Sequence, residues 1–336
     1  MTFARLAARL LAMLLLLSPV AGPARAADPI VIKFSHIVAP DTPKGMTADK
    51  FKQLAEAMTG GRVKVEVYPN STLYKDGEEL AALQRGDVQI LAPSISRLAL
   101  LGAHEFEVFD LPFLFKDYDA VHRVTGGDVG QKLLAGLAPY GLEGIAFLDN
   151  GFKDMSANRP LHGPADYRGL KMRIQPSAVL EAEMKALGAT PVTLSFSETY
   201  KALKAGTVDG TENAPSNLFT QRMHEVQTNL SVTNHGYLGY AVIVNKAFWD
   251  KLPPDIRAAL EAAMQQATAY GNEIAAKQNL DALEKIRAAG TTVIYQPTPA
   301  ELEALKTALL PVHKETAGRI GQATIEAVYG AVGFQP

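Results

Sequence analysis

Residues 254–288, PDIRAALEAAMQQATAYGNEIAAKQNLDALEKIRA, are the stretch that decides the fold. Pro254 suits a first helical turn, and the stretch has no further proline and a single glycine, Gly271. Apolar residues recur near helical spacing at Ile256, Leu260, Met264, Ala267, Ile274 and Leu283. About 35 residues at 1.5 Å each make a helix about 50 Å long, whereas a lobe of ~120 residues is about 30 Å across. The helix therefore either breaks near Gly271 or spans two lobes, and we favour the spanning helix.

Strands and helices alternate in the sequence before this helix. The first unit comprises a strand at 29–34, a helix that stops at Gly60-Gly61, a strand at 63–67, a helix that follows Asp76 and a strand at 88–92. Another strand is expected at 144–148. A second unit follows, with strands at 170–174, 190–194 and 208–212, helices at 177–187 and 198–204, and a long strand at 237–245. This order predicts an α/β fold with parallel strands in two lobes.

Residues 1–26 have the pattern of a secretory signal peptide. Arg5 and Arg9 precede the apolar stretch LLAMLLLLSPV at 10–20, and Ala24-Arg25-Ala26 provides a small-x-small cleavage pattern. The apolar run of about 11 residues is roughly half of the ~20 needed to span a bilayer, which disfavours an uncleaved anchor. We therefore predict cleavage after Ala26 and a mature protein that is exported and not embedded in a membrane.

The composition excludes several classes of function. Lys plus Arg number 33 and Asp plus Glu number 35, so the net charge of -2 argues against nucleic-acid binding. The absence of cysteine excludes disulfides, thiolate nucleophiles and iron–sulfur clusters. The chain has no GxSxG, HExxH, GxxxxGK[ST] or GxGxxG motif, and its seven histidines are scattered. We expect no catalytic residue, no metal and no cofactor.

Polar residues follow several predicted strands. In parallel α/β sheets, ligands bind at the carboxyl ends of the strands. The residues at those positions are Ser35, His36, Ser94, Ser96, Arg173, Gln175 and Asn213. A set of hydrogen-bond donors that includes an arginine suits a small anion such as a carboxylate. A structural salt bridge remains the alternative role for Arg173.

Seven segments of the mature chain form a specific combination of motifs: KFSHIVAPDTPKG (33–45), RVKVEVYPNSTLYKDGEEL (62–80), EFEVFDLPFLF (105–115), NGFKDMSANRP (150–160), GLKMRIQPS (169–177), SFSETYKALKAGTVDGTENAPSN (195–217) and HGYLGYAVIVNK (235–246). In these motifs the chain resembles the substrate-binding proteins of TRAP (tripartite ATP-independent periplasmic) transporters of the DctP type. The resemblance implies a two-lobed periplasmic binding protein with a lobe-spanning helix. It implies one lobe of 27–150 plus about 239–278, a second of 151–238 plus about 279–336, and a ligand cleft between them.

The resemblance also implies which residues bind the ligand in the second lobe. Arg173 matches the family's hallmark arginine, which takes one ligand carboxylate through two parallel hydrogen bonds. Lys153 stands at a second cationic position, where lysine also occurs in the C4-dicarboxylate branch. Asn213 matches an amide that binds the same carboxylate, and Phe196 matches an aromatic residue that packs against the ligand.

The first lobe is expected to hold the distal carboxylate. His36, Lys75, Ser94 and Arg97 stand on segments that resemble ligand-facing loops, and we rank Lys75 and Ser94 first among them. Tyr237 or Tyr240 could reach the cleft from the strand at 237–245. Each of these residues has the alternative of a surface or core position.

The resemblance therefore implies a periplasmic receptor that binds a C4-dicarboxylate such as succinate, fumarate or malate. Its partners would be this ligand and the subunits of a TRAP membrane permease, to which it delivers the ligand for secondary active uptake. Two alternatives remain open. One is a receptor of the same type for a 2-oxo acid, a sugar acid or an aromatic acid. The other is a periplasmic enzyme that uses His36 and a lysine on a small acid.

Overall fold

The computed structural model describes residues 28–336, so the predicted signal peptide and its cleavage site lie outside the described residues. The strands are β1 (Ile30–Ser35), β2 (Val63–Tyr68), β3 (Ile90–Leu91), β4 (Leu142–Ala157), β5 (Lys171–Ile174), β6 (Thr190–Thr193), β7 (Gly210–Asn213), β8 (Asn229–Asn245) and β9 (Val293–Tyr295). In this part of the chain they form one sheet in the order β2-β1-β3-β8-β4-β7-β5-β6, with β9 paired to β8.

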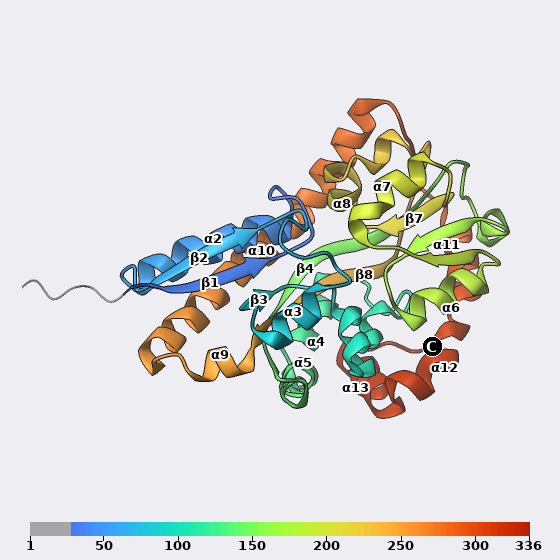
Figure 1. The fold of residues 1–336 in the computed structure, drawn as a ribbon. Helices are drawn as coiled ribbons and strands as arrows, with labels where there is room; N and C mark the ends of the chain where they lie inside the picture. Colours follow the sequence, from blue (N-terminus) through green and yellow to red (C-terminus); the bar gives the residue numbers. More distant parts are fainter. Residues whose placement is uncertain (1–27) are drawn as a thin grey trace, which may run out of the picture.

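Two groups of parallel strands lie toward opposite ends of this sheet. β1 pairs in parallel with β2 and β3, and β5 pairs in parallel with β6 and β7. These groups are the two predicted α/β units. The antiparallel strands β4 and β8, of 16 and 17 residues, run between the two groups (Figure 1). At about 3.3 Å per residue, each is roughly 50 Å long.

The sequence predicted only parts of β4 and β8, at 144–148 and 237–245. Polar residues and glycines such as Asn150, Gly151 and Gly236 interrupt the apolar pattern on which that prediction rested. In the structure, Gly151 pairs with Leu238 and Lys153 pairs with Gly236, so both strands continue through these positions. Because their backbones pair with each other, these segments do not depend on a continuous apolar pattern.

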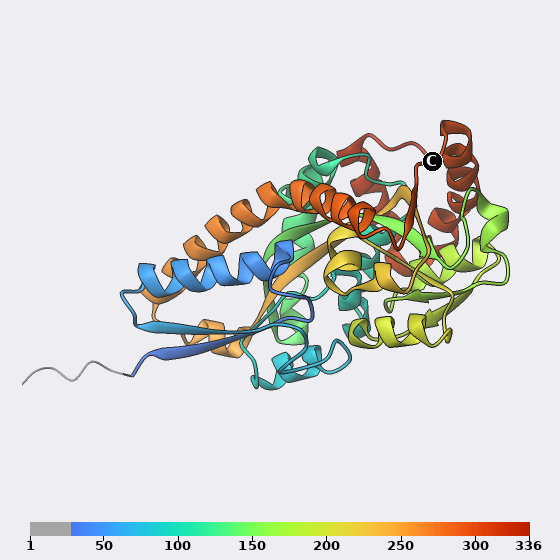
Figure 2. The same ribbon diagram turned by 90° about the horizontal axis from the view of Figure 1, so that it is seen from above.

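Helices pack against the strands at both ends of the molecule (Figures 1 and 2). The α-helices are α2 (Pro43–Met58), α3 (Glu79–Arg85), α4 (Tyr118–Thr125), α5 (Asp128–Ala135), α6 (Ala178–Ala186), α7 (Phe196–Lys204), α8 (Pro215–Thr220), α9 (Lys246–Asp250), α10 (Pro254–Ala289), α11 (Pro299–Leu309), α12 (Pro311–Ile320) and α13 (Gln322–Val332). Short 3-10 helices are η1 (Ile95–Leu101), η2 (His104–Asp110), η3 (Ala138–Tyr140), η4 (Pro164–Tyr167) and η5 (Met223–Glu225). No helix within residues 28–336 has an apolar run of the length needed to cross a membrane.

The helix α10 is continuous over 36 residues and does not break at Gly271. It packs on α2, on β4 and on α8, and so runs from the end of the molecule that carries β1 and β2 to the end that carries α7 and α8 (Figure 1). The prediction of a spanning helix is therefore confirmed. Gly271 is buried against α2, and a Cβ atom there would lie 2.1 Å from Thr47 Oγ1. The glycine thus allows two helices to approach closely.

The expected lobe boundaries fall at irregular positions of the two long strands. The register between β4 and β8 shifts between Asp149 and Gly151, opposite Gly239 and Leu238. Such bulges bend a strand locally. The C-terminal helices were expected to belong to the second lobe. However, α13 packs on α4 and η2, and α12 packs on both η2 and α6. The segment 311–332 therefore contacts both expected lobes.

Candidate functional site

A cavity lies between segments of the two expected lobes. The empty space in and around it, including space open to solvent, is about 340 Å³. The residues that line it are Ile37, Val38, Asp76, Ser94, Arg97, Arg173, Gln175, Phe196, Asn213, Asn217, Leu238 and Tyr240. These residues come from the segments after β1 and before α3, from η1 or the residue just before it, and from β8. The others lie in or beside β5, α7, β7 and α8. The carboxyl ends of β1, β5 and β7 all contribute, as the ligand rule for parallel sheets predicts.

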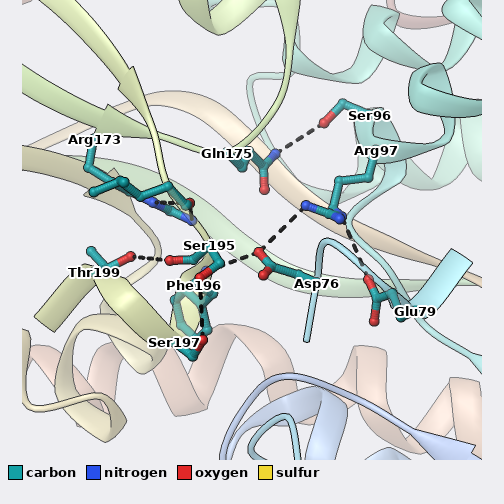
Figure 3. Close-up of polar contacts among 11 residues, drawn as sticks. Asp76, Glu79, Ser96, Arg97, Arg173, Gln175, Ser195, Phe196, Ser197 and Thr199 are labelled. Atoms are coloured by element: carbon teal, nitrogen blue, oxygen red, sulfur yellow. Dashed lines mark hydrogen bonds and ion pairs between the residues drawn. The ribbon is translucent and has the colours of Figure 1, made fainter. Parts of the chain in front are cut away.

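Arg173 is held in a fixed orientation beside this cavity. Its Nε and Nη2 donate hydrogen bonds of 3.1 Å and 2.9 Å to the carbonyl oxygen of Leu194 (Figure 3). The guanidinium carbon lies 5.9 Å from the centre of the Phe196 ring. Burial lowers the pKa of Arg173 to about 10, although Glu212 and Asp76 oppose this effect. The side chain is therefore cationic at neutral pH, and Nη1 and the second N–H of Nη2 are left for an anion.

Arg97 is a second buried cation on the opposite side of the cavity. Its Nη1 lies 3.5 Å from Asp76 Oδ2, and its Nε lies 3.6 Å from Glu79 Oε1. Both arginines are almost completely buried. The charge of Arg97 is near enough to lower the pKa of Arg173. The two positive groups therefore face one small cavity from segments far apart in the sequence (Figure 3).

A buried lysine, Lys44, lies near Arg97. Lys44 Nζ donates to the carbonyl oxygen of Ala92 at 2.9 Å and lies 3.7 Å from the centre of the Tyr240 ring. Burial lowers the pKa of Lys44 and raises the pKa of its neighbour Glu79. These shifts favour the neutral amine of Lys44 and the neutral carboxylic acid of Glu79. Most of the fixed positive charge on the Arg97 side of the cavity therefore belongs to Arg97.

Amide and hydroxyl groups complete the lining of the cavity. Asn213 Oδ1 accepts hydrogen bonds of 2.9 Å from Asn217 Nδ2 and from the backbone of Ala214. Because both bonds use Oδ1, the Nδ2 end of Asn213 is the end that can donate to a ligand oxygen. Asn217 Nδ2 also lies 3.4 Å from the hydroxyl of Tyr240.

Three contacts connect the two expected lobes around the cavity. Asp76 Oδ2 accepts a 2.9 Å hydrogen bond from the backbone N–H of Phe196. Gln175 Nε2 donates to Ser96 Oγ at 3.1 Å (Figure 3). At the rim, Lys75 Nζ lies 3.5 Å from Glu198 Oε1. The structure is therefore a closed arrangement, in which the two sides touch directly.

Four of the eight residues expected from the sequence line the cavity, namely Arg173, Asn213, Phe196 and Ser94. Lys75, which ranked first with Ser94, does not line it. Its side chain is 57% exposed and contacts Glu198 at the surface. The flexible stem of a surface lysine gives no fixed charge inside a closed cleft.

Lys153 does not line the cavity either. It lies 2.9 Å from Glu212 Oε2 and 3.6 Å from Asp110 Oδ1, and all three side chains are buried. Burial acts to lower the pKa of Lys153, but Glu212, Asp110 and Glu183 together raise it above its ordinary value. Glu212 also interacts with the charge of Arg173. Lys153 thus pairs with a buried carboxyl group that also interacts with Arg173.

His36 and Tyr237 are buried outside the lining of the cavity. Burial and the charge of Lys44 lower the pKa of His36 to about 3, so its imidazole is neutral. His36 immediately precedes Ile37 and Val38, which do line the cavity. The hydroxyl of Tyr237 donates to Asp149 Oδ1 at 2.5 Å, on the bulged part of β4, whereas Tyr240 reaches the cavity.

Sequence reasoning considered Arg97, Gln175 and Tyr240 without selecting them, and it missed Asp76 and Asn217. One signal was available for Arg97. It stands three residues after Ser94, and residues three apart lie on the same face of a 3-10 helix. The backbone N–H of Arg97 donates to the carbonyl oxygen of Ser94 at 3.0 Å, so both side chains reach one cavity.

Within residues 28–336, no group of three or more histidine, aspartate and glutamate side chains is arranged to hold a metal ion. The charged groups of the site are instead two arginines and the carboxylates beside them. Such a site can bind an anion by hydrogen bonds and charge.

Comparisons with known proteins agree with this chemistry. Residues 34–319 match the family model of the bacterial extracellular solute-binding proteins, family 7. The chain is 61% identical over 305 residues to the C4-dicarboxylate-binding periplasmic protein DctP of Rhodobacter capsulatus, covering 91% of this chain and 92% of that protein.

Two solved structures with bound ligands are similar. A TRAP periplasmic solute-binding protein of Shewanella oneidensis with bound succinate has a TM-score of 0.88 and 41% identity, covering 90% of this chain and 99% of that one. Another from Pseudomonas aeruginosa PAO1, with bound L-malate, has a TM-score of 0.84 and 46% identity, covering 85% of this chain and 100% of that one.

Proposed function

Because this chain belongs to family 7 of the bacterial extracellular solute-binding proteins, we propose that it is a receptor for a C4-dicarboxylate such as succinate, fumarate or malate. The observation that carries the proposal is the pair of buried arginines, Arg173 and Arg97, on opposite sides of one small cavity. A dicarboxylate has one negative group for each. Relatives at 41% and 46% identity were solved with succinate and with L-malate, which supports this ligand class.

Each end of the ligand has its own set of donors in this proposal. Nη1 and the remaining N–H of Nη2 of Arg173, together with the Nδ2 group of Asn213, take the proximal carboxylate. Phe196 packs beside the guanidinium and excludes water. Arg97 and the hydroxyl of Ser94 take the distal carboxylate. Hydrogen bonds between charged groups in a water-excluded site are stronger and more specific than those at a surface.

The proposed mechanism is binding without chemistry. The ligand contacts residues of both expected lobes and therefore stabilises the closed state relative to the open one. The closed receptor then delivers the ligand to the subunits of a TRAP permease in the periplasm, after export directed by residues 1–26. No reaction of the ligand is part of this proposal.

Thermal unfolding with a panel of acids tests the ligand class. A ligand that binds only the folded state stabilises it by about 4.1 kcal/mol at 1,000 times its dissociation constant. We expect succinate, fumarate or malate to raise the melting temperature more than 2-oxo monoacids, sugar acids or aromatic acids do. A shift with one of those acids and none with a C4-dicarboxylate would contradict the proposal. Labelled succinate, fumarate and malate, incubated with the pure protein, should be recovered unchanged.

A further inference from the structure

Asp76 places a carboxylate in the wall of a cavity that is proposed to bind a dianion. This residue precedes α3 and is almost completely buried. Its Oδ2 accepts from the backbone N–H of Phe196 at 2.9 Å and lies 3.5 Å from Arg97 Nη1. A carboxylate at this position is a partner for Arg97, but its charge opposes a ligand carboxylate placed beside it.

The other oxygen of Asp76 has no partner within the described residues. Oδ1 is buried and receives no hydrogen bond there. Two neighbouring atoms share this condition, since Arg97 Nε and Glu79 Oε1 are 3.6 Å apart and neither has a hydrogen-bond partner in the described part of the chain. A buried polar group without a partner costs about 1–3 kcal/mol, and a charged one costs more.

A ligand that satisfies this end of the cavity must both accept and donate hydrogen bonds. Arg97 needs an acceptor, which any distal carboxylate provides. Asp76 Oδ1 needs a donor, which the carboxylates and methylene groups of succinate do not provide. A hydroxyl group next to the distal carboxylate provides it.

Resting on the proposed function, we propose that Asp76 selects, among C4-dicarboxylates, those that carry a hydroxyl group on the chain. Asp76 Oδ1 accepts the hydrogen bond of this hydroxyl while Arg97 binds the adjacent carboxylate. A 2-hydroxy dicarboxylate such as malate is then preferred over its 2-oxo counterpart, oxaloacetate. The ketone oxygen of oxaloacetate only accepts hydrogen bonds and faces the acceptor Oδ1. Sites built for a polar group reject the analogue that lacks it.

Calorimetric titration of the full mature chain with malate, oxaloacetate and succinate tests this proposal. Wild-type protein should bind malate at least about tenfold more tightly than oxaloacetate, which is roughly 1.4 kcal/mol. In Asp76→Asn, the amide oxygen can keep the contacts with Phe196 N–H and Arg97. Its Nδ2 then replaces Oδ1 and donates to a ketone. The ratio of the two dissociation constants should therefore fall at least about tenfold in this variant.

Glu79→Gln is the matched control, because it also replaces a carboxyl group beside Arg97 by an amide, but at a position that does not line the cavity. It should change the affinities for malate and oxaloacetate by the same factor and leave their ratio within about twofold of wild type.

Equal wild-type affinities for malate and oxaloacetate would overturn the proposal, and this measurement needs no variant. A ratio that does not move in Asp76→Asn, or moves equally in Glu79→Gln, would also overturn it. Failure of the proposed function looks different: wild-type protein would then bind neither malate nor succinate.

Discussion

At the scale of single residues, the two arginines differ in how the protein holds them. Arg173 Nε donates its hydrogen bond to the carbonyl oxygen of Leu194. The two parallel hydrogen bonds expected for a ligand carboxylate must therefore come from the two terminal nitrogens. Arg97 has no such contact with a backbone carbonyl group; its neighbours are the carboxyl groups of Asp76 and Glu79, at 3.5 Å and 3.6 Å. One cation is therefore held by a neutral carbonyl group, whereas the other lies against carboxyl groups.

The substitution Arg173→Lys should weaken the binding of every carboxylate ligand. An ammonium group keeps the charge but cannot bind the Leu194 carbonyl and a carboxylate with the same planar fork. Loss of one hydrogen bond to a charged group costs about 1.5–3 kcal/mol, so calorimetry should show at least a ~10-fold weaker affinity for succinate. Unfolding in urea should remain cooperative. An affinity equal to wild type would mean that the anion site lies elsewhere.

Arg97 should set the preference for dicarboxylates over monocarboxylates. Butyrate leaves the distal end of the cavity without its anion, so succinate should bind at least about 100-fold more tightly, or roughly 2.7 kcal/mol. We expect Arg97→Gln to reduce that ratio sharply, as measured by calorimetry.

Lys75→Ala is the control for Arg97→Gln, because Lys75 carries the same charge but is exposed at the rim. An exposed ion pair contributes about 0–1 kcal/mol, so its removal should leave the ratio near its wild-type value. If the ratio of succinate to butyrate affinity instead changed in Lys75→Ala and not in Arg97→Gln, Lys75 would bind the distal carboxylate, as the sequence analysis expected.

At the scale of elements, the helix α10 depends on a glycine that sequence analysis considered a possible break. Gly271 faces Thr47 of α2, whose Oγ1 donates to the carbonyl oxygen of Pro43 at 2.7 Å. The Cβ and Cγ2 atoms of Thr47 also lie 3.2 Å and 3.4 Å from the added Cβ position, so the whole Thr47 side chain, and not its hydroxyl alone, crowds this site. The position is restricted by packing.

Gly271→Ala should therefore destabilise the protein despite the better helix propensity of alanine. Overpacking of this kind costs about 1–3 kcal/mol, measured by urea unfolding. Gly318→Ala, in α12, is the control, since a Cβ there meets nothing within 4 Å. It should be neutral or stabilising by up to about 1 kcal/mol. Thr47→Ala should rescue Gly271→Ala in part. Equal effects at the two glycines would show that close helix packing is not the reason for Gly271.

The elements show which features could be predicted from the sequence. Local patterns predicted the long helix and the two parallel units, because helical periodicity and short apolar runs are signals carried by neighbouring residues. Position at strand ends also selected Arg173, Asn213 and Ser94. Lys153 could not be placed in this way, because its contacts with Glu212 and Asp110 join residues about 40 to 60 positions apart. The same holds for Asp76, whose partner Phe196 is 120 positions away.

At the scale of the whole molecule, the structure is closed because residues of the two expected lobes bond to each other. Asp76 accepts from the backbone of Phe196, and Gln175 donates to Ser96. These contacts surround the cavity, so a ligand between them gains contacts with both sides only in this arrangement. A ligand shifts a conformational equilibrium only by its difference in affinity for the two states.

Small-angle scattering should accordingly show a smaller radius of gyration with saturating succinate than without it. The curve with ligand should match the one calculated from this closed structure, whereas the ligand-free curve should correspond to a wider molecule hinged near the irregular register at Asp149 and Gly151. Arg173→Ala should keep the wider form at the same succinate concentration, because the ligand then lacks its contact with the guanidinium group of Arg173. Lys75→Ala should close like wild type, since its ion pair with Glu198 is exposed. A radius that stays the same for wild-type protein at full occupancy would contradict closure, because a ligand bound equally well by both states cannot move the two lobes.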